Sequence, residues 1–468
     1  MPRTPIMLMG CTSDAGKSFL VTALCRHYAN QGVRVAPFKA QNMSNNAAVT
    51  PEGLEIGRAQ YVQALAARVT PQARMNPILL KPSADTHSQV IVMGRHDAVA
   101  TRTPWLERAP RLWPVISGAL HSLASEFEQL VIEGAGSPAE VNLHDTDLVN
   151  MRVALECDAD VYLVADIDRG GAFAHLYGTY LCLDPAEQRR IKGFVLNKFR
   201  GDPKLLGNAM DWLEERTSVP TVAIVPFMRH ALPEEDAMHH RALFDPGKLN
   251  IALGLYPYAS NLDEFDPLVN EAGVNVVPIR GREPLSHYAA VLLPGSKNTA
   301  ESLRYLRSTG LAEEIVAAAA RGVPVFGVCG GLQLLGHRIH DPHRLEGGDI
   351  DGLGLLDVTT TLDADKVTRQ CETRTDDGVL VRGYEIHHGN TEAGPDARPH
   401  LADGLGWTQG PITGVYVHGL FENTEYRRRW LERLGWTARG ARGSEWSAVV
   451  DADIDRAAAL IAASGWQP

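Results

Sequence analysis

The sequence has few cysteines, no excess of basic residues and no long apolar run. Its six cysteines are scattered over 468 residues without a Cys-x-x-Cys pair, so neither a disulfide framework nor a zinc site is indicated. The formal net charge of −11 argues against general nucleic-acid binding, which needs a basic face to neutralise phosphates. The first residues lack an apolar signal core, and no run approaches bilayer-spanning length, so we expect a cytoplasmic protein without a membrane partner.

What the first half does contain is a regular alternation of short apolar runs and helical patterns. Continuous apolar strands alternating with helices predict an α/β fold with a doubly wound parallel sheet. A second alternating series starts at residue 251, followed after about residue 347 by short strands and turns, and predicts a separate α/β unit. The candidate strands of the first half are 6–9, 33–38, 130–132, 161–165, 191–196 and 221–225.

A stretch rich in charge and proline near residues 230–250 has no clear period and indicates the join between two domains. We therefore predict a front domain over 1–235, a linker over 236–250, a back domain over 251–440 and a C-terminal helical extension over 441–468.

The first chemical motif is GCTSDAGKS, from Gly10 to Ser18, between an apolar run and a helical segment. This strand–loop–helix context predicts a phosphate-binding loop, in which backbone N–H groups and a helix N-terminus receive phosphate oxygens. Lys17 would add a positive charge near the β- and γ-phosphates, and Ser18 could hold Mg²⁺. The usual spacing places a glycine at position 11, where this chain has Cys11. We predict that a nucleoside triphosphate binds here.

Polar residues follow several predicted strands of the first half, at the edge where ligands of parallel sheets bind. Lys39, Glu133, Asp166 and Asn197 each come directly after an apolar run. Because a carboxylate opposite a phosphate loop suits a metal, we predict that Mg²⁺ is held by Ser18 and Glu133, with Glu55 as a third candidate.

The most specific stretch of the second half is VPVFGVCGGLQLLG, residues 323–336. Cys329 ends an apolar strand, is flanked by glycines and precedes a helix, which is typical of a nucleophile on a tight turn. The helix N-terminus would favour the thiolate. Backbone N–H groups should stabilise the oxyanion, and we predict Gly330 and Gly295 in the LLPGSKNT turn as donors.

A cysteine nucleophile needs a base, and His418 in GVYVHGLFEN stands at the end of a strand-like run. His387 and His388, in GYEIHHG, are the competing candidates.

These motifs resemble those of class I glutamine amidotransferases fused to an ATP-binding domain like that of dethiobiotin synthetase. The GxCGGxQ pattern at 327–333 and the PGS turn at 294–296 carry the glutaminase resemblance. Longer stretches resemble the cobyric acid synthase family of cobalamin biosynthesis. They are the phosphate loop, APFKAQNMSNN (36–46), EIGRAQ (55–60), NPILLKP (76–82), SQVIVMG (88–94), EGAGSPAEVNL (133–143), DIDRGGAFA (166–174), NKFRGD (197–202), LPGSKNT (293–299), GYEIHHG (383–389) and VHGLF (417–421).

The resemblance implies ATP-dependent amidation of the b, d, e and g carboxylates of adenosylcobyrinic acid a,c-diamide to adenosylcobyric acid, through an acyl phosphate. L-glutamine would supply the ammonia, ATP and Mg²⁺ would be required, and no tightly bound prosthetic group is expected. The family's catalytic pair falls on Cys329 and His418, the corrinoid is the expected partner, and homo-oligomerisation stays open. The expected ATP-binding residues are Gly10, Asp14, Gly16, Lys17, Ser18, Asn197 and Lys198, and the expected substrate contacts are Lys39, Gln41, Asn42 and Lys81.

One departure concerns the residue that orients the catalytic histidine. Ordinary class I glutaminases place a glutamate two residues after it, whereas this chain has Leu420, and Glu385 and Glu422 are the candidate replacements. Cobyrinic acid a,c-diamide synthase, the peptidoglycan-precursor amidating pair, CTP synthase and a non-catalytic nucleotide switch are the alternatives. The KAQNMSNN and NKFRGD stretches favour the cobyrate branch.

Overall fold

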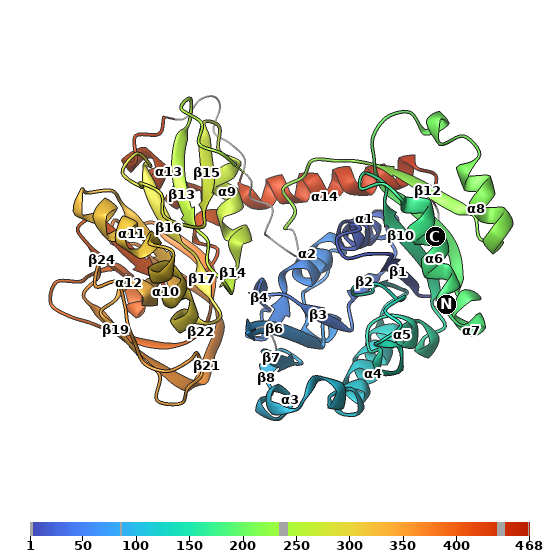
Figure 1. Ribbon diagram of the computed structural model, residues 1–468, viewed down its shortest axis with the longest axis horizontal. Helices are drawn as coiled ribbons and strands as arrows, with labels where there is room; N and C mark the ends of the chain where they lie inside the picture. Colours follow the sequence, from blue (N-terminus) through green and yellow to red (C-terminus); the bar gives the residue numbers. More distant parts are fainter. Residues whose placement is uncertain (1–2, 85–86, 234–241, 438–444, 467) are drawn as a thin grey trace.

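The computed structural model describes residues 3–84, 87–233, 242–437, 445–466 and 468 and has two lobes (Figure 1). The front domain forms the blue-to-green lobe, and the back domain forms the yellow-to-orange lobe. Part of the predicted linker, 236–241, and the predicted boundary between 440 and 441 lie outside the described residues. Among those described, no helix combines the length and apolar character needed to cross a bilayer.

A six-stranded sheet forms the centre of the front domain, in the order β12-β11-β10-β1-β9-β2. Every neighbouring pair is parallel, which confirms the predicted doubly wound sheet. All six predicted strands are present, because apolar runs buried on both faces leave few other folding options. The strands are β1 (Ile6–Gly10), β2 (Val35–Phe38), β9 (Gln129–Glu133), β10 (Asp160–Asp166), β11 (Ile191–Phe199) and β12 (Thr221–Pro226).

Helices cover both faces of this sheet, as the alternation of buried side chains along β1 illustrates. Ile6 and Leu8 belong to the core formed with α1 (Lys17–Asn30), α2 (Arg58–Ala66) and α14 (Trp446–Ala463). Met7 and Met9 belong to the core on the other face. The remaining helices of this domain are α3 (Ala98–Arg102), α4 (Ala109–Glu126), α5 (Met151–Glu156), α6 (Ala172–Leu181), α7 (Pro185–Gln188) and α8 (Ala209–Thr217).

The C-terminal helix α14 packs on the front domain, although its sequence follows the back domain. It lies beside α1, and Ile461 shares a buried core with Leu24 (Figure 1). The buried Arg26 forms ion pairs with Asp451 at 2.5 Å and Asp455 at 2.7 Å. The predicted extension is therefore a structural part of the front domain.

Two small sheets of the front domain face the back domain (Figure 1). One has the order β3-β6-β7-β8 and the other pairs β4 with β5. Val49, Leu79 and Ile91 from these sheets form one apolar cluster with Ile386 of the back domain, so the two domains share a packed interface. The strands are β3 (Gln41–Met43), β4 (Ala47–Val49), β5 (Glu55–Gly57), β6 (Ile78–Ala84), β7 (His87–Val92) and β8 (Arg95–His96).

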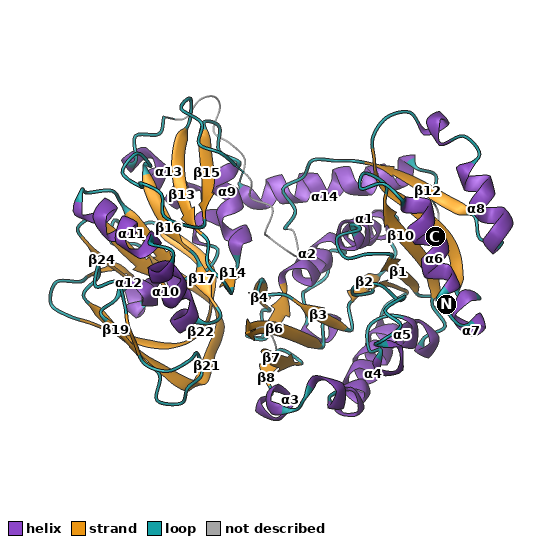
Figure 2. Ribbon diagram, in the orientation of Figure 1, coloured by secondary structure: helices purple, strands orange, loops and turns teal. Residues whose placement is uncertain are grey.

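The back domain is a second α/β unit around a seven-stranded sheet of order β15-β13-β16-β18-β25-β24-β23 (Figure 2). Neighbouring strands from β15 to β25 in this order are parallel, whereas β24 pairs antiparallel with β25 and β23 pairs antiparallel with β24. The strands are β13 (Leu249–Gly254), β15 (Val274–Ile279), β16 (Ala290–Leu293), β18 (Val325–Val328), β23 (Arg398–Leu401), β24 (Gly406–Gln409) and β25 (Ile412–Val415).

The predicted change of texture after residue 347 corresponds to a second sheet, β20-β19-β21-β22. Its long antiparallel pair, β21 (Val358–Arg374) and β22 (Leu380–Ala393), reaches the front domain. The other elements are β14 (Ala259–Ser260), β17 (Gly295–Ser296), β19 (Arg338–His340), β20 (Ile350–Asp351), α9 (Asp266–Val269), α10 (Thr299–Ser308), α11 (Leu311–Ala320), α12 (Gly330–Leu335) and α13 (Thr424–Arg433).

Candidate active site

The phosphate loop lies between β1 and α1, as the sequence predicts. Gly16 caps α1 with a φ of 88°, in the left-handed region that favours glycine. A Cβ atom at this position would collide with the side chain of Asn197, whose Nδ2 donates to the carbonyl of Ala15 at 2.9 Å. Two segments far apart in the sequence therefore hold the loop.

A hollow beside this loop is lined by six of the seven predicted nucleotide-binding residues: Asp14, Gly16, Lys17, Ser18, Asn197 and Lys198. Gly10 lies behind the loop, where a Cβ would come within 2.8 Å of Lys17 Nζ. The lining of this hollow also includes Phe19 and His230, whose rings stack with their centroids 5.0 Å apart. A phosphate-binding end and a flat aromatic end suit a nucleotide.

The buried carboxylate of Glu133 lies at the end of β9, next to the start of α1. Its Oε1 accepts from Ser18 Oγ and Lys39 Nζ, both at 2.8 Å, and its Oε2 accepts from Gln63 Nε2 at 2.6 Å. Burial alone would raise the pKa of Glu133, but the charge of Lys39 and these hydrogen bonds lower it. Glu133 is therefore ionised, and its oxygen and the Ser18 hydroxyl are ligands of the kind that Mg²⁺ prefers.

Glu55, the third predicted metal ligand, lies elsewhere. Both of its oxygens are engaged by lysines: Oε1 by Lys81, and Oε2 by Lys366 of the back domain at 2.5 Å. Burial would raise the pKa of Glu55, but the surrounding lysines lower it strongly. This placement separates Glu55 from the pair formed by Ser18 and Glu133, so the three predicted metal ligands do not lie together.

A second hollow of the front domain meets the first at Asp14 and Lys17, which line both. Lys39, Gln41 and Asn42, three of the predicted substrate contacts, line this second hollow. Lys81, the fourth predicted contact, does not line it and instead lines the cavity that contains Cys329. Large apolar side chains such as Trp105 and Met43 also line the second hollow, together with three acidic residues and the cations Lys17, Lys39 and Arg108. Its cationic and apolar parts suit a large anionic ligand.

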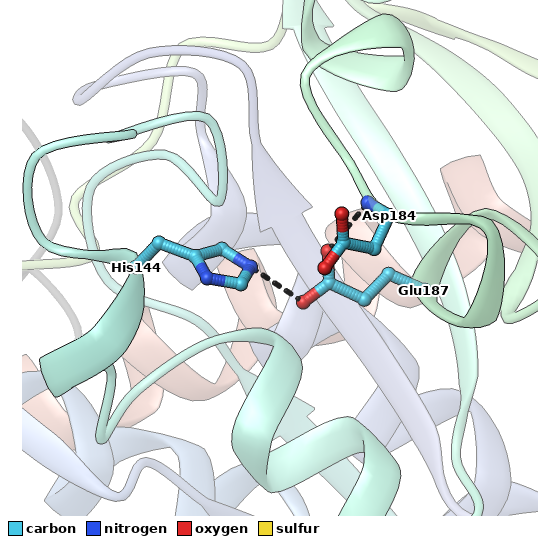
Figure 3. A group of neighbouring side chains, drawn as sticks. All are labelled: His144, Asp184 and Glu187. Atoms are coloured by element: carbon cyan, nitrogen blue, oxygen red, sulfur yellow. Dashed lines mark hydrogen bonds and ion pairs between the residues drawn. The ribbon is translucent and has the colours of Figure 1, made fainter.

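Three side chains lie close enough together to hold a metal ion: His144, Asp184 and Glu187 (Figure 3). His144 also lines this hollow. The two carboxylates form the capping box of α7, in which Glu187 Oε2 accepts from the backbone of Asp184 at 2.9 Å. Glu187 Oε1 lies 3.1 Å from His144 Nε2, and this contact raises the pKa of His144. The capping box and this ion pair account for the group without a metal ion.

Cys329 lies on a strained turn between β18 and α12. Its φ of 52° and ψ of −107° are unusual for a residue with a side chain, as expected at a nucleophile turn. The neighbouring glycines permit close packing, because a Cβ on Gly330 would lie 2.5 Å from Ser296 N and one on Gly331 would collide with the carbonyl of Leu293. The turn therefore holds the thiol at the start of a helix.

His418 lies in the same cavity as Cys329. Its Nδ1 lies 3.2 Å from Oε1 of Glu264, which is buried in the 3₁₀ turn η5 (Leu262–Phe265). Burial tends to lower the pKa of His418, but the charges of Glu264 and Cys329 raise it to about 10. Cys329, His418 and Glu264 therefore form a connected group, with the arrangement that a nucleophile, an acid–base group and an orienting carboxylate require. Gly295 borders this group, since a Cβ there would lie 3.2 Å from His418 Cε1.

The competing histidines have other partners. His387 Nε2 lies 3.1 Å from Glu385, and its Nδ1 donates to the carbonyl of Gly389 at 2.8 Å. Burial and nearby lysines lower the pKa of His388 to about 3, so it is neutral. His418 is the histidine whose geometry suits the base.

Neither candidate replacement for the orienting glutamate contacts His418. Glu385 pairs with Arg369 and His387, and Glu422 pairs with Arg58 of α2. Sequence reasoning missed Glu264 because it lies 154 residues before His418 and belongs to no motif. The sequence feature that could have identified Glu264 is its position in an acidic segment after the first strand of the back domain.

The front domain contacts the segment that carries Glu264. The backbone N–H of Ala47 donates to Asn261 Oδ1 at 2.9 Å, and Arg58 Nε donates to Asp263 Oδ2 at 2.8 Å. Tyr384, whose ring stacks on His418 at 5.4 Å, donates its hydroxyl to the carbonyl of Ala47 at 3.0 Å. The groups that position His418 are thus held by both domains.

Comparisons with known proteins agree with this division into two sites. Residues 6–239 match the CobQ/CobB/MinD/ParA nucleotide binding domain, and residues 250–426 match the CobB/CobQ-like glutamine amidotransferase domain. The chain is 54% identical to the cobyric acid synthase of Deinococcus radiodurans over 441 residues, covering 91% of this chain and 92% of that protein. It is 50% identical to the cobyric acid synthase of Polaromonas naphthalenivorans, covering 90% of this chain and 92% of that protein. A solved glutamine amidotransferase covers 40% of this chain and is itself fully covered, with a TM-score of 0.33 and 16% identity.

Proposed function

This chain belongs to the cobyric acid synthase family, and from that premise we propose that it amidates the b, d, e and g carboxylates of adenosylcobyrinic acid a,c-diamide. It is a glutamine amidotransferase of cobalamin biosynthesis; the four positions and the chemistry below are our proposal. The observation that carries it is the meeting of two hollows at Lys17, one suited to a nucleotide and one to a large anionic ligand.

In the front domain, a substrate carboxylate attacks the γ-phosphorus of ATP, ADP leaves, and an acyl phosphate forms. Activation is needed because amide formation from a free carboxylate is unfavourable in water. Lys17 offsets the charge on the transferring phosphoryl group, and Lys39 presents a cation to the acid. Ser18 and Glu133 would hold Mg²⁺, which neutralises phosphate charge when bound.

In the back domain, the Cys329 thiolate attacks the side-chain carbonyl of glutamine, and the N–H groups of Gly330 and Gly295 stabilise the oxyanion. Protonated His418 donates its proton to the departing ammonia, which leaves a glutamyl thioester. Neutral His418 then removes a proton from water, which attacks the thioester and releases glutamate. Glu264 keeps the imidazole oriented in both steps.

One small sheet of the front domain borders both sites. Gln41 and Asn42 of β3 line the substrate hollow, and Lys81 of the neighbouring strand β6 lines the Cys329 cavity. Ammonia then attacks the acyl phosphate, phosphate leaves, and the amide forms.

A mass-resolved time course with the a,c-diamide, ATP and glutamine tests the proposed reaction. Each amidation exchanges OH for NH₂, so we expect four successive decreases of about one mass unit, all dependent on ATP. Amidation of the unamidated diacid in preference to the a,c-diamide would contradict the proposal and favour an a,c-diamide synthase. Failure to release glutamate with all substrates present would favour a non-catalytic switch.

We expect Glu264→Gln to slow glutamine hydrolysis about 10- to 100-fold, because general acid–base catalysis depends on the orientation of its group. The glutamate charge raises the pKa of His418 to about 10, so its removal lowers that pKa. His418 would then lose its proton at a lower pH. The alkaline limb of the kcat/KM profile for glutamine hydrolysis should therefore move to lower pH by at least about one pH unit. The pH–rate profile measures this shift.

Glu385→Gln is the matched control, since Glu385 is also buried but pairs with His387 and Arg369. Its alkaline limb should coincide with that of the unmodified enzyme. An unchanged limb in Glu264→Gln would remove Glu264 from the catalytic group.

A further inference from the structure

The cavity that contains Cys329 and His418 is also lined by four charged side chains. Lys297 and Glu346 of the back domain line it, together with Lys366 and with Lys81 from the front domain. None of these four residues takes part in the attack on the amide carbonyl. Their charges therefore need another explanation.

Two of the three lysines have an ion-pair partner in the protein. Glu55 engages Lys81 through one carboxylate oxygen and Lys366 through the other. Among the described residues, no ion pair or hydrogen bond reaches Lys297 Nζ, although the side chain is partly buried. A partly buried ammonium group without a counter-ion is costly, which points to a ligand anion.

Glu346 is the corresponding anion. Its Oε2 accepts from the backbone N–H and the hydroxyl of Thr299, both at 2.9 Å. Its Oε1 has no hydrogen-bond donor within the described part of the chain, and no ion pair joins it to Lys297 there. The cavity thus presents one cation and one anion that do not satisfy each other by contact.

An α-amino acid carries one carboxylate and one ammonium group, which match this pair in number and sign. Lys297 also closely follows Gly295, which borders His418, and both Ser296 and Lys297 line the cavity. A ligand held at its charged end by Lys297 and Glu346 would extend its side chain toward Cys329.

We propose that Lys297 binds the α-carboxylate of the glutamine donor and that Glu346 binds its α-ammonium group. This assignment rests on the proposed glutaminase function and adds the basis of donor selectivity. It explains how a small cavity can select free glutamine over an amide that lacks the amino-acid head group. Lys297 and Glu346 are therefore binding residues, remote from the bond that breaks.

The test compares three donors in the full-length enzyme: glutamine, 4-aminobutanamide, which lacks the α-carboxylate, and glutaramic acid, which lacks the α-ammonium group. We expect Lys297→Met to raise KM for glutamine about 10- to 100-fold, the usual effect of losing a charge-assisted hydrogen bond. Its kcat/KM for 4-aminobutanamide should match that of the unmodified enzyme, because that donor offers nothing for Lys297 to bind. Glu346→Gln should show the same pattern with glutaramic acid.

Lys248→Met, which removes an exposed lysine of the same domain, is the matched control and should leave all donors unaffected. An unchanged KM for glutamine in Lys297→Met would overturn the proposal. An equal loss with glutamine and 4-aminobutanamide would also overturn it, because that result indicates a general distortion of the cavity. These assays follow hydrolysis in the back domain, so they are separate from the corrinoid time course, whose failure would contradict the proposed substrate instead.

Discussion

Replacing Cys329 by alanine is expected to abolish synthesis driven by glutamine and to spare synthesis driven by ammonium salt. Without the thiolate no glutamyl thioester forms, and loss of a catalytic nucleophile lowers rates by about 10⁴-fold or more. The proposed acyl-phosphate site lies in the other domain, around Lys17 and Glu133, and keeps all of its residues. Product formation with each nitrogen source, measured at a pH that supplies free ammonia, gives the ratio that checks this prediction.

Cys182→Ala provides the control, because that cysteine is exposed and follows α6 of the front domain, away from the Cys329 turn. It should retain both activities. Loss of ammonium-driven synthesis in Cys329→Ala would contradict the separation of the two sites. Retention of glutamine-driven synthesis would remove Cys329 from the mechanism.

Replacing Lys17 by alanine should suppress synthesis from either nitrogen source by about 10³-fold, the usual effect of removing a preorganised charge from a transition state. Lys17 lies where the nucleotide and substrate hollows meet, so no acyl phosphate should form at a useful rate. ATP-dependent phosphate release with the a,c-diamide and ammonium salt measures this step directly.

Lys192→Met is a suitable control for Lys17→Ala, since Lys192 is a surface residue of β11 near Asp160. It should leave phosphate release unchanged. Near-normal phosphate release in Lys17→Ala would mean that the loop from Gly10 to Ser18 does not serve phosphoryl transfer.

The sequence predicted the sheet of the front domain and the two motif turns well because their signals are local. Apolar runs such as those of β1 and β10 are buried on both faces, and the Cys329 turn is fixed by adjacent glycines. Glu264 could not be found in this way. Its role depends on the approach of η5 to His418, which is set by the packing of the whole back domain.

The positions of Glu55 and Lys81 at the domain interface could not be predicted for a related reason. Both residues lie in motifs of the front domain, and a local pattern cannot say which domain a side chain faces. Glu55 pairs with Lys81 and with Lys366, and Lys366 belongs to a strand of the other lobe, 311 residues after Glu55. Likewise, the amphipathic pattern of α14 predicts a helix but does not reveal that α1 is its neighbour.

Because α14 returns to the front domain, the glutaminase is an insertion joined to its host by two crossings of the chain. A domain joined by two connections can rotate about the line between them, but it cannot separate as far as a domain joined by a single linker. Movements of the back domain against the front domain are therefore restricted to those that both crossings allow. For the same reason, a cut at the first crossing would yield a front fragment without its last helix, so this enzyme cannot be divided into two autonomous halves by a single break.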